Sequence, residues 1–196
     1  MHRKIKMPPW WTLAWLALCA TGTVTLAGTQ APPAPHSAYT DDEVTRAAND
    51  FFKTGAESLG KVLGKVLKEK GQPIAIVRGE EAGGAIAVGL RYGHGELIYK
   101  GAPGIKVYWQ GPSIGFDLGA DAVKVFALVY DLPKTETLFQ RFPSAEGSLY
   151  FVGGFGVNYL QRGATVIAPV RFGVGWRQGL DVGYMHFTPE KHINPF

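Results

Sequence analysis

One short motif in this chain has the spacing of a catalytic nucleophile. Residues 111–115 read G-P-S-I-G, which fits the G-x-S-x-G nucleophile elbow, and Asp181 and His186 follow in the order of a hydrolase triad. The elbow requires a strand, a strained turn and then a helix. The residues after Ser113 alternate as in a strand instead. A serine hydrolase acting through Ser113 is therefore the alternative interpretation, and the main prediction is that the protein is not an enzyme.

The other chemistry-bearing residues predict neither a cofactor nor a metal site. Residues 55–62 resemble a phosphate-binding loop, but Val62 stands where Ser or Thr must reach Mg²⁺. The single cysteine, Cys19, excludes a disulfide framework and a Cys-rich zinc site. No two histidines have the i, i+4 spacing of a helical metal site with a carboxylate; those after the leader are His36, His94, His186 and His192.

Three lysines form a candidate anionic-surface binding site. Lys61, Lys65 and Lys68 have the i, i+4 and i+7 spacing that aligns side chains in one stripe of a helix. Apolar residues cover the other faces of this segment. Such a basic amphipathic helix could lie against anionic lipid headgroups or lipopolysaccharide phosphates. The alternative is a helix that packs on the rest of the domain with a solvated lysine face.

These lysines fall in a segment, residues 40–71, that predicts helix. Thr40 and Glu43 have the spacing of a capping box, which marks a helix start. Gly55 and Gly60 weaken the middle, so we expect one broken helix or two short ones, ending near Gly71. A further short helix is expected around residues 135–142.

Residues 72–196 show the period of two that is typical of β-strands, as in 105–110 and 165–177. Gly-rich stretches such as 92–96 predict the turns between them. We count about nine or ten strands with no helix-length segment among them, which argues against parallel βαβ units. The predicted fold is mainly β: a small, Gly-rich, mostly antiparallel β-barrel of about eight to ten strands, preceded by the helical segment. Glycine, at 26 of 196 residues, would let the strands bend and pack closely.

The aromatic residues of this barrel have two interpretations. They either fill the interior and pack against the helical segment, or line an apolar lumen that holds a lipid-like molecule. The sequence leaves both open. The candidate lumen residues are Trp109, Phe116, Phe172 and Trp176.

Residues 1–27 have the layout of a secretory signal peptide. A basic start precedes an apolar run at 10–20, and Thr25-Leu26-Ala27 forms a small-residue cleavage site. The run is shorter than the about 20 residues that a membrane span needs, so an uncleaved anchor is only the alternative. We expect a periplasmic mature chain that begins near Gly28, with a disordered linker over 28–39. Its nearly balanced charge gives no case for nucleic-acid binding.

Two longer runs resemble a known family. Residues 83–96, GGAIAVGLRYGHGE, and 109–128, WQGPSIGFDLGADAVKVFAL, resemble the alphaproteobacterial DUF 1134 group, also called the envelope integrity protein A family. The resemblance implies a small periplasmic β-barrel that is needed for cell-envelope integrity and has no established enzymatic activity. Residues 115–122 are also distantly similar to SYLF domains, which bind phosphoinositide lipids. Neither family supplies catalytic residues that match this chain.

Together these observations predict a non-enzymatic periplasmic protein that supports cell-envelope integrity. A lipid or other small hydrophobic molecule is the candidate ligand, and the expected partners are envelope components such as lipid or lipopolysaccharide, not nucleic acid. The alternatives are the serine hydrolase through Ser113 and a purely structural interaction module without a ligand. The oligomeric state is left open.

Overall fold

Two helices open the part of the chain that the computed structural model describes, which comprises residues 36–86, 88–113, 122–145, 149–173 and 183–192. Helix α1 (Asp41–Phe52) begins with the predicted capping box, which is confirmed. The Thr40 hydroxyl accepts the backbone N–H of Glu43 at 3.3 Å, and the Glu43 carboxylate accepts that of Thr40 at 2.8 Å. The helix ends at Lys53, which has a left-handed conformation with φ 57°.

Helix α2 (Glu57–Lys70) follows after a short break that contains Gly55. Gly60 lies inside this helix, so only the first of the two glycines coincides with the interruption. Gly71 ends α2 with a φ of 77°, a conformation that favours glycine. Within the described residues no helix is both long and apolar enough to span a membrane.

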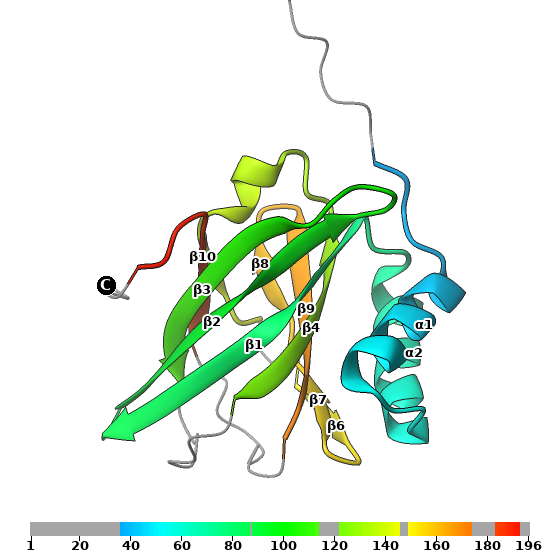
Figure 1. The fold of residues 1–196 in the computed structure, drawn as a ribbon, viewed down its shortest axis with the longest axis horizontal. Coiled ribbons are helices and arrows are strands. Elements are labelled where there is room, and N and C mark those ends of the chain that lie inside the picture. Colours follow the sequence, from blue (N-terminus) through cyan, green and yellow to red (C-terminus); the bar gives the residue numbers. More distant parts are fainter. Residues whose placement is uncertain (1–35, 87, 114–121, 146–148, 174–182, 193–196) are drawn as a thin grey trace, which may run out of the picture. The chain divides into compact units, whose positions relative to one another are not determined.

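The strands that follow form a single sheet in which every described pairing is antiparallel (Figure 1). Most neighbours in the sheet follow the order β5-β10-β3-β2-β1-β4-β9-β7-β6, and β8 pairs with β9. The strands are β1 (Ala75–Ile86), β2 (Val88–Tyr99), β3 (Ile105–Ser113), β4 (Val123–Tyr130), β5 (Arg141–Pro143), β6 (Tyr150–Val152), β7 (Phe155–Val157), β8 (Leu160–Arg162), β9 (Thr165–Phe172) and β10 (Tyr184–Thr188).

The sheet closes through its β5 end, which meets β8. An isolated bridge joins Ser144, the residue after β5, to Leu160 in β8. The pairings therefore lead from β9 through β4, β1, β2, β3, β10 and β5 to β8, and from there back to β9. The mostly antiparallel β-barrel with a helical segment before it is confirmed. Before β5, the helix expected around residues 135–142 is only a 3-10 turn, η1 (Thr135–Leu138).

The predicted turn at residues 92–96 is wrong, because this stretch lies in the middle of β2. Its glycines serve a close approach of backbones. A Cβ atom on Gly95 would lie 2.2 Å from the carbonyl oxygen of Arg78, and one on Gly79 would lie 2.1 Å from that of His94. Glycine is thus required where β1 and β2 cross closely, not where the chain reverses.

Apolar side chains pack on both sides of the barrel wall. An inner cluster fills the described interior with residues such as Val77, Leu97 and Phe187. An outer cluster lies between the wall and the helices, which contact β4, β6 and β7 (Figure 1). The helices therefore cover only one side of the barrel.

Candidate functional site

The barrel interior holds a buried ion pair among its apolar residues. Glu81 and Arg171 are each about 1% exposed, and the Arg171 Nε donates to Glu81 Oε1 at 2.6 Å. The Trp109 indole N–H donates to the other oxygen of Glu81 at 3.0 Å, and Arg171 Nη1 donates to Asn158 Oδ1 at 2.8 Å. Such a pair is tolerable only with several hydrogen bonds, because removing a charge from water costs several kcal/mol. This network fixes β1, β3 and β9 to one another.

Of the four candidate lumen residues the structure describes two, Trp109 and Phe172, and these lie on opposite faces of the barrel wall. Trp109 is 2% exposed and packs so closely on β2 that a Cβ on Gly93 would lie 2.1 Å from its ring. Phe172 differs from the expectation: it is 46% exposed, and its ring centroid lies 4.6 Å from that of Phe155 in the outer cluster, with the two rings tilted by 37°. Its neighbour Arg171 takes the inward position, and strand residues alternate between faces. Phe116 and Trp176 lie outside the described residues.

Two of the three hydrolase candidates, Ser113 and His186, lie on the neighbouring strands β3 and β10. Ser113 ends β3, in register with Gly89, so the serine lies within a strand pair. His186 in β10 pairs with Gln110 in β3. Asp181 lies outside the described residues. The described residues contain no group of His, Cys, Asp or Glu placed to hold a metal ion.

The lysine stripe lies on α2, where two of its three members are ion-paired. Lys61 contacts Glu57 at 2.8 Å, and Lys65 contacts Glu69 on the same helix. The Lys65 ammonium also lies 5.2 Å from the Tyr150 ring centroid. Lys68 is exposed. Carboxylates on the same helix therefore offset part of the positive charge of the stripe.

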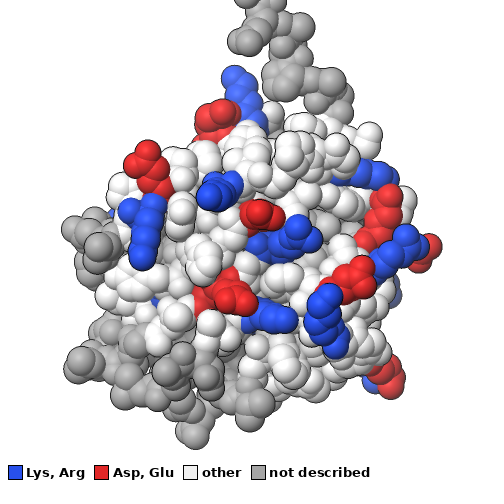
Figure 2. Space-filling view, in the orientation of Figure 1, with Lys and Arg blue, Asp and Glu red and all other residues white. Residues whose placement is uncertain are grey.

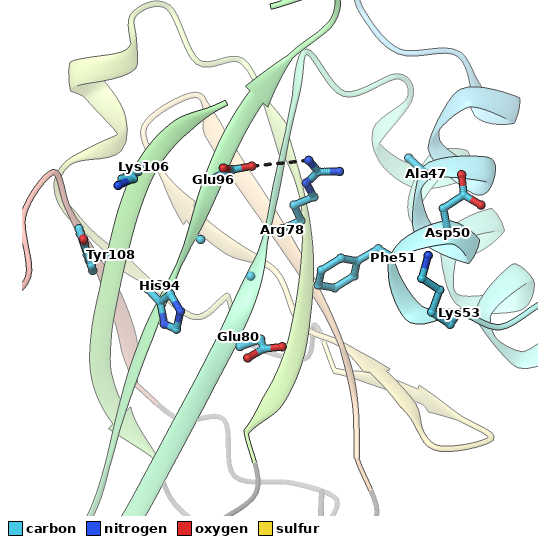
Figure 3. A pocket seen from close by; sticks show the side chains of 12 residues that line it. Ala47, Asp50, Phe51, Lys53, Arg78, Glu80, His94, Glu96, Lys106 and Tyr108 are labelled. Carbon is cyan, nitrogen blue, oxygen red and sulfur yellow. Dashed lines mark ion pairs between the residues drawn. The ribbon is translucent and has the colours of Figure 1, made fainter. Parts of the chain in front are cut away.

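A groove runs over the barrel wall that the helices leave uncovered (Figure 3). It has a volume of about 840 Å³ and lies between the end of α1 and the outer faces of β1, β2 and β3. Cross-strand pairing sets its floor: Glu80 pairs with His94, which pairs with Tyr108. In the neighbouring row Arg78, Glu96 and Lys106 alternate in charge. Asp50, Phe51 and Lys53 form the wall on the α1 side.

A second hollow of about 410 Å³ continues the groove toward the C-terminal residues. It shares His94 and Tyr108 with the first, and Tyr92, Thr188 and Lys191 also line it. Tyr92 is among the few large hydrophobic side chains exposed in the described part of the protein. We call these two hollows together the outer groove.

Several polar side chains of the outer groove are available to a ligand. Glu80, His94, Lys106 and Tyr108 make no hydrogen bond or ion pair with the described residues, whereas Arg78 and Glu96 contact each other at 3.5 Å. Figure 2 shows acidic and basic side chains interspersed on this face. The outer groove thus offers both signs of charge, two phenol rings and an imidazole.

Burial lowers the pKa of His186, which lies beside the outer groove in β10, and the charges of Arg141 and His192 lower it further. The neutral imidazole is therefore favoured there at neutral pH.

Comparison with known proteins decides the family. The model of the family described as envelope integrity protein A matches residues 37–196. The chain belongs to this family. A crystal structure of a beta-barrel-like, uncharacterized protein from Brucella abortus is 36% identical, with a TM-score of 0.74 over 81% of this chain and 99% of that one. No curated protein matches the chain.

For this member of the envelope integrity protein A family, the sequence missed both the buried pair and the outer groove. Glu81 and Arg171 stand 90 residues apart, and nothing local marks them as partners. The outer groove depends on which side of the barrel α1 covers. A signal did exist in β2 and β3, where Tyr92, His94 and Tyr108 alternate with buried residues and so had to face outward.

Proposed function

We propose that this protein acts in the periplasm, without enzymatic activity, and supports cell-envelope integrity by binding an envelope component in the outer groove. The observation that carries the proposal is the open outer groove, in which Glu80, His94, Lys106 and Tyr108 make no hydrogen bond or ion pair with the described residues. The family assignment supports the envelope role. The predicted signal peptide over residues 1–27 supports the compartment, and N-terminal sequencing of the native protein should begin near Gly28.

The buried Glu81–Arg171 pair disfavours a carrier that would hold a lipid inside the barrel. A lipid chain needs an apolar cavity of several hundred Å³. In the described interior the charged Glu81–Arg171 pair lies among the apolar side chains, so that space is not wholly apolar. Native mass spectrometry of protein isolated from its own host should therefore find no co-purified lipid.

The experiment is complementation of a deletion strain under detergent stress. Deletion should make the cells sensitive, and the wild-type gene should restore growth. A groove variant with Glu80→Gln, His94→Ala and Tyr108→Ala should fail to restore it although the protein is present at the wild-type level. A control with Lys68→Gln, at an exposed position of α2 that does not line the outer groove, should restore it fully.

Two results would refute the proposal. One is unchanged growth of the deletion strain under every envelope stress. The other is full complementation by the groove variant. Labelling of the purified protein by a serine-reactive probe, lost in Ser113→Ala, would instead support the hydrolase alternative.

A further inference from the structure

The two ends of the outer groove differ in chemistry, and together they fit one kind of ligand. We infer that the outer groove binds a glycan strand that carries short peptides with both carboxylate and ammonium groups, which is the chemistry of peptidoglycan. This inference rests on the proposed function and names the envelope component that the site would take.

The end formed by β2, β3 and β10 suits a sugar chain. Tyr92 is 36% exposed and Tyr108 is half-buried, so each presents part of a ring to the outer groove. A phenol ring offers an apolar face for the C–H groups of a sugar and a hydroxyl for its polar edge. His94 lies where the two hollows meet, and its imidazole makes no hydrogen bond to the described residues that would compete. Hydroxyl and acetamido groups are the complement of such side chains.

The end formed by α1 and β1 suits a peptide with charges of both signs. Asp50 and Glu80 can accept from an ammonium group, and Lys53 and Lys106 can donate to carboxylates. None of these four has an ion pair within the described residues. Because both signs of charge are present, a ligand of one charge would meet repulsion from part of this end.

The same mixture of charges disfavours a purely anionic partner. A membrane or lipopolysaccharide surface would attract Lys53 and Lys106, but it would repel the nearby carboxylates of Asp50, Glu80 and Glu96. The outer groove is also hollow, with a volume of about 840 Å³ at its charged end, whereas a flat surface makes no use of a depression.

The test is co-sedimentation with purified peptidoglycan sacculi. The wild-type protein should pellet with them, and Tyr108→Ala should bind about three- to tenfold more weakly, as expected for the loss of one aromatic contact. Tyr108→Phe keeps the ring and loses only the hydroxyl, so its binding should lie between that of the wild type and that of Tyr108→Ala. Tyr150→Ala, which removes a half-buried tyrosine from the helix-covered side, is the matched control and should bind normally. Thermal unfolding of each variant separates lost binding from lost folding.

A second arm separates the two ends of the outer groove. Glycan strands freed of their stem peptides by an amidase are soluble, because the peptides provide the cross-links of the sacculus, so their binding is measured by titration in solution. Glu80→Gln should weaken binding to intact sacculi and leave binding to the soluble glycan strands unchanged, because Glu80 faces the peptide end. Tyr108→Ala should weaken binding to both.

Failure of the inference and failure of the proposed function can be told apart. If the wild type does not pellet with sacculi, or if it binds lipopolysaccharide vesicles instead, the peptidoglycan inference is overturned, while the complementation result still decides the proposed function. Equal pelleting of the wild type and Tyr108→Ala would overturn the inference as well. If the groove variant complements the deletion, the proposed function fails whatever the sacculi show.

Discussion

The two outer sides of this barrel are built from the same kind of strand but carry opposite chemistry. On β4 and β9 the outward residues are apolar, such as Phe126, Leu128 and Val170, and they pack under the helices. On β2 and β3 the outward residues are polar, such as His94 and Lys106, and they form the floor of the outer groove. The inward residues are apolar over much of both sides. The outward-facing residues therefore determine which side of the barrel the helices cover.

Helix α1 marks the border between the covered and the bare side. Lys100 contacts Glu43 of the helix at 2.7 Å, and Lys124 donates to the Phe51 carbonyl at 3.2 Å. The same helix thus buries one side of the barrel and forms a wall of the outer groove. The polar contacts that hold α1 in place can therefore be tested separately from the apolar packing beneath the helix.

The largest expected difference between the sides concerns folding stability. Phe126→Ala should lower the free energy of unfolding by about 3–5 kcal/mol, because the side chain is buried against Phe51 and Phe52. His94→Ala on the bare side should change it by less than about 0.5 kcal/mol. Denaturant titration of both variants measures the difference. Equal losses would mean that the bare side is as tightly packed as the covered one.

A second pair compares the interior with the outer groove at adjacent positions of one strand. Glu81→Gln should cost about 3 kcal/mol of unfolding free energy, because it leaves the buried Arg171 guanidinium without its counter-charge. Glu80→Gln, one residue away on the outer face, should be nearly neutral, since Glu80 is exposed and unpaired in the described structure. If Glu80→Gln destabilised the protein as much as Glu81→Gln, the assignment of these two residues to opposite faces would be wrong.

These neighbours also show what the sequence could and could not predict. Local signals gave the capping box at Thr40 and the strands with a period of two, because the causes lie within a few residues. The run from Gly93 to Gly95 led to a wrong prediction of a turn, because glycine also occurs where two backbones approach closely. The burial of Glu81 and the exposure of Glu80 depend on Arg171 and α1, which meet β1 only in the folded barrel.

The contact of Glu43 in α1 with Lys100 of the barrel should weaken at low pH. Hydrogen bonds from Lys100 and from the Thr40 backbone lower the pKa of Glu43 from its usual 4.5 to about 2. A lowered pKa in the folded state means that the ionised carboxylate contributes stability above pH 4.5, and that this contribution is lost as the pH falls toward 2. Glu43→Gln keeps a capping acceptor and removes the charge. Its melting temperature should lie below that of the wild type at pH 6, and the gap should close near pH 2. A gap that stays constant would refute the role of the charge.

The smallest effect is expected on the far surface of the covering helices, at Lys61, Lys65 and Lys68. If these lysines bound an anionic membrane freely, each would add about 1 kcal/mol, so a triple glutamine variant would lose about a hundredfold in vesicle affinity. Because Glu57 and Glu69 already pair with two of them, we expect a change of only about twofold, as is typical of weak exposed pairs.

Co-sedimentation with anionic vesicles at low salt distinguishes these outcomes. A variant with Glu57→Gln and Glu69→Gln is the matched control, because it frees the lysines without removing them. This control should bind the vesicles more tightly than the wild type does, and added salt should abolish the gain. A hundredfold loss in the triple variant, steeply dependent on salt, would instead show that the covered side of the protein meets a membrane. The bare side would then not be its only surface for the envelope.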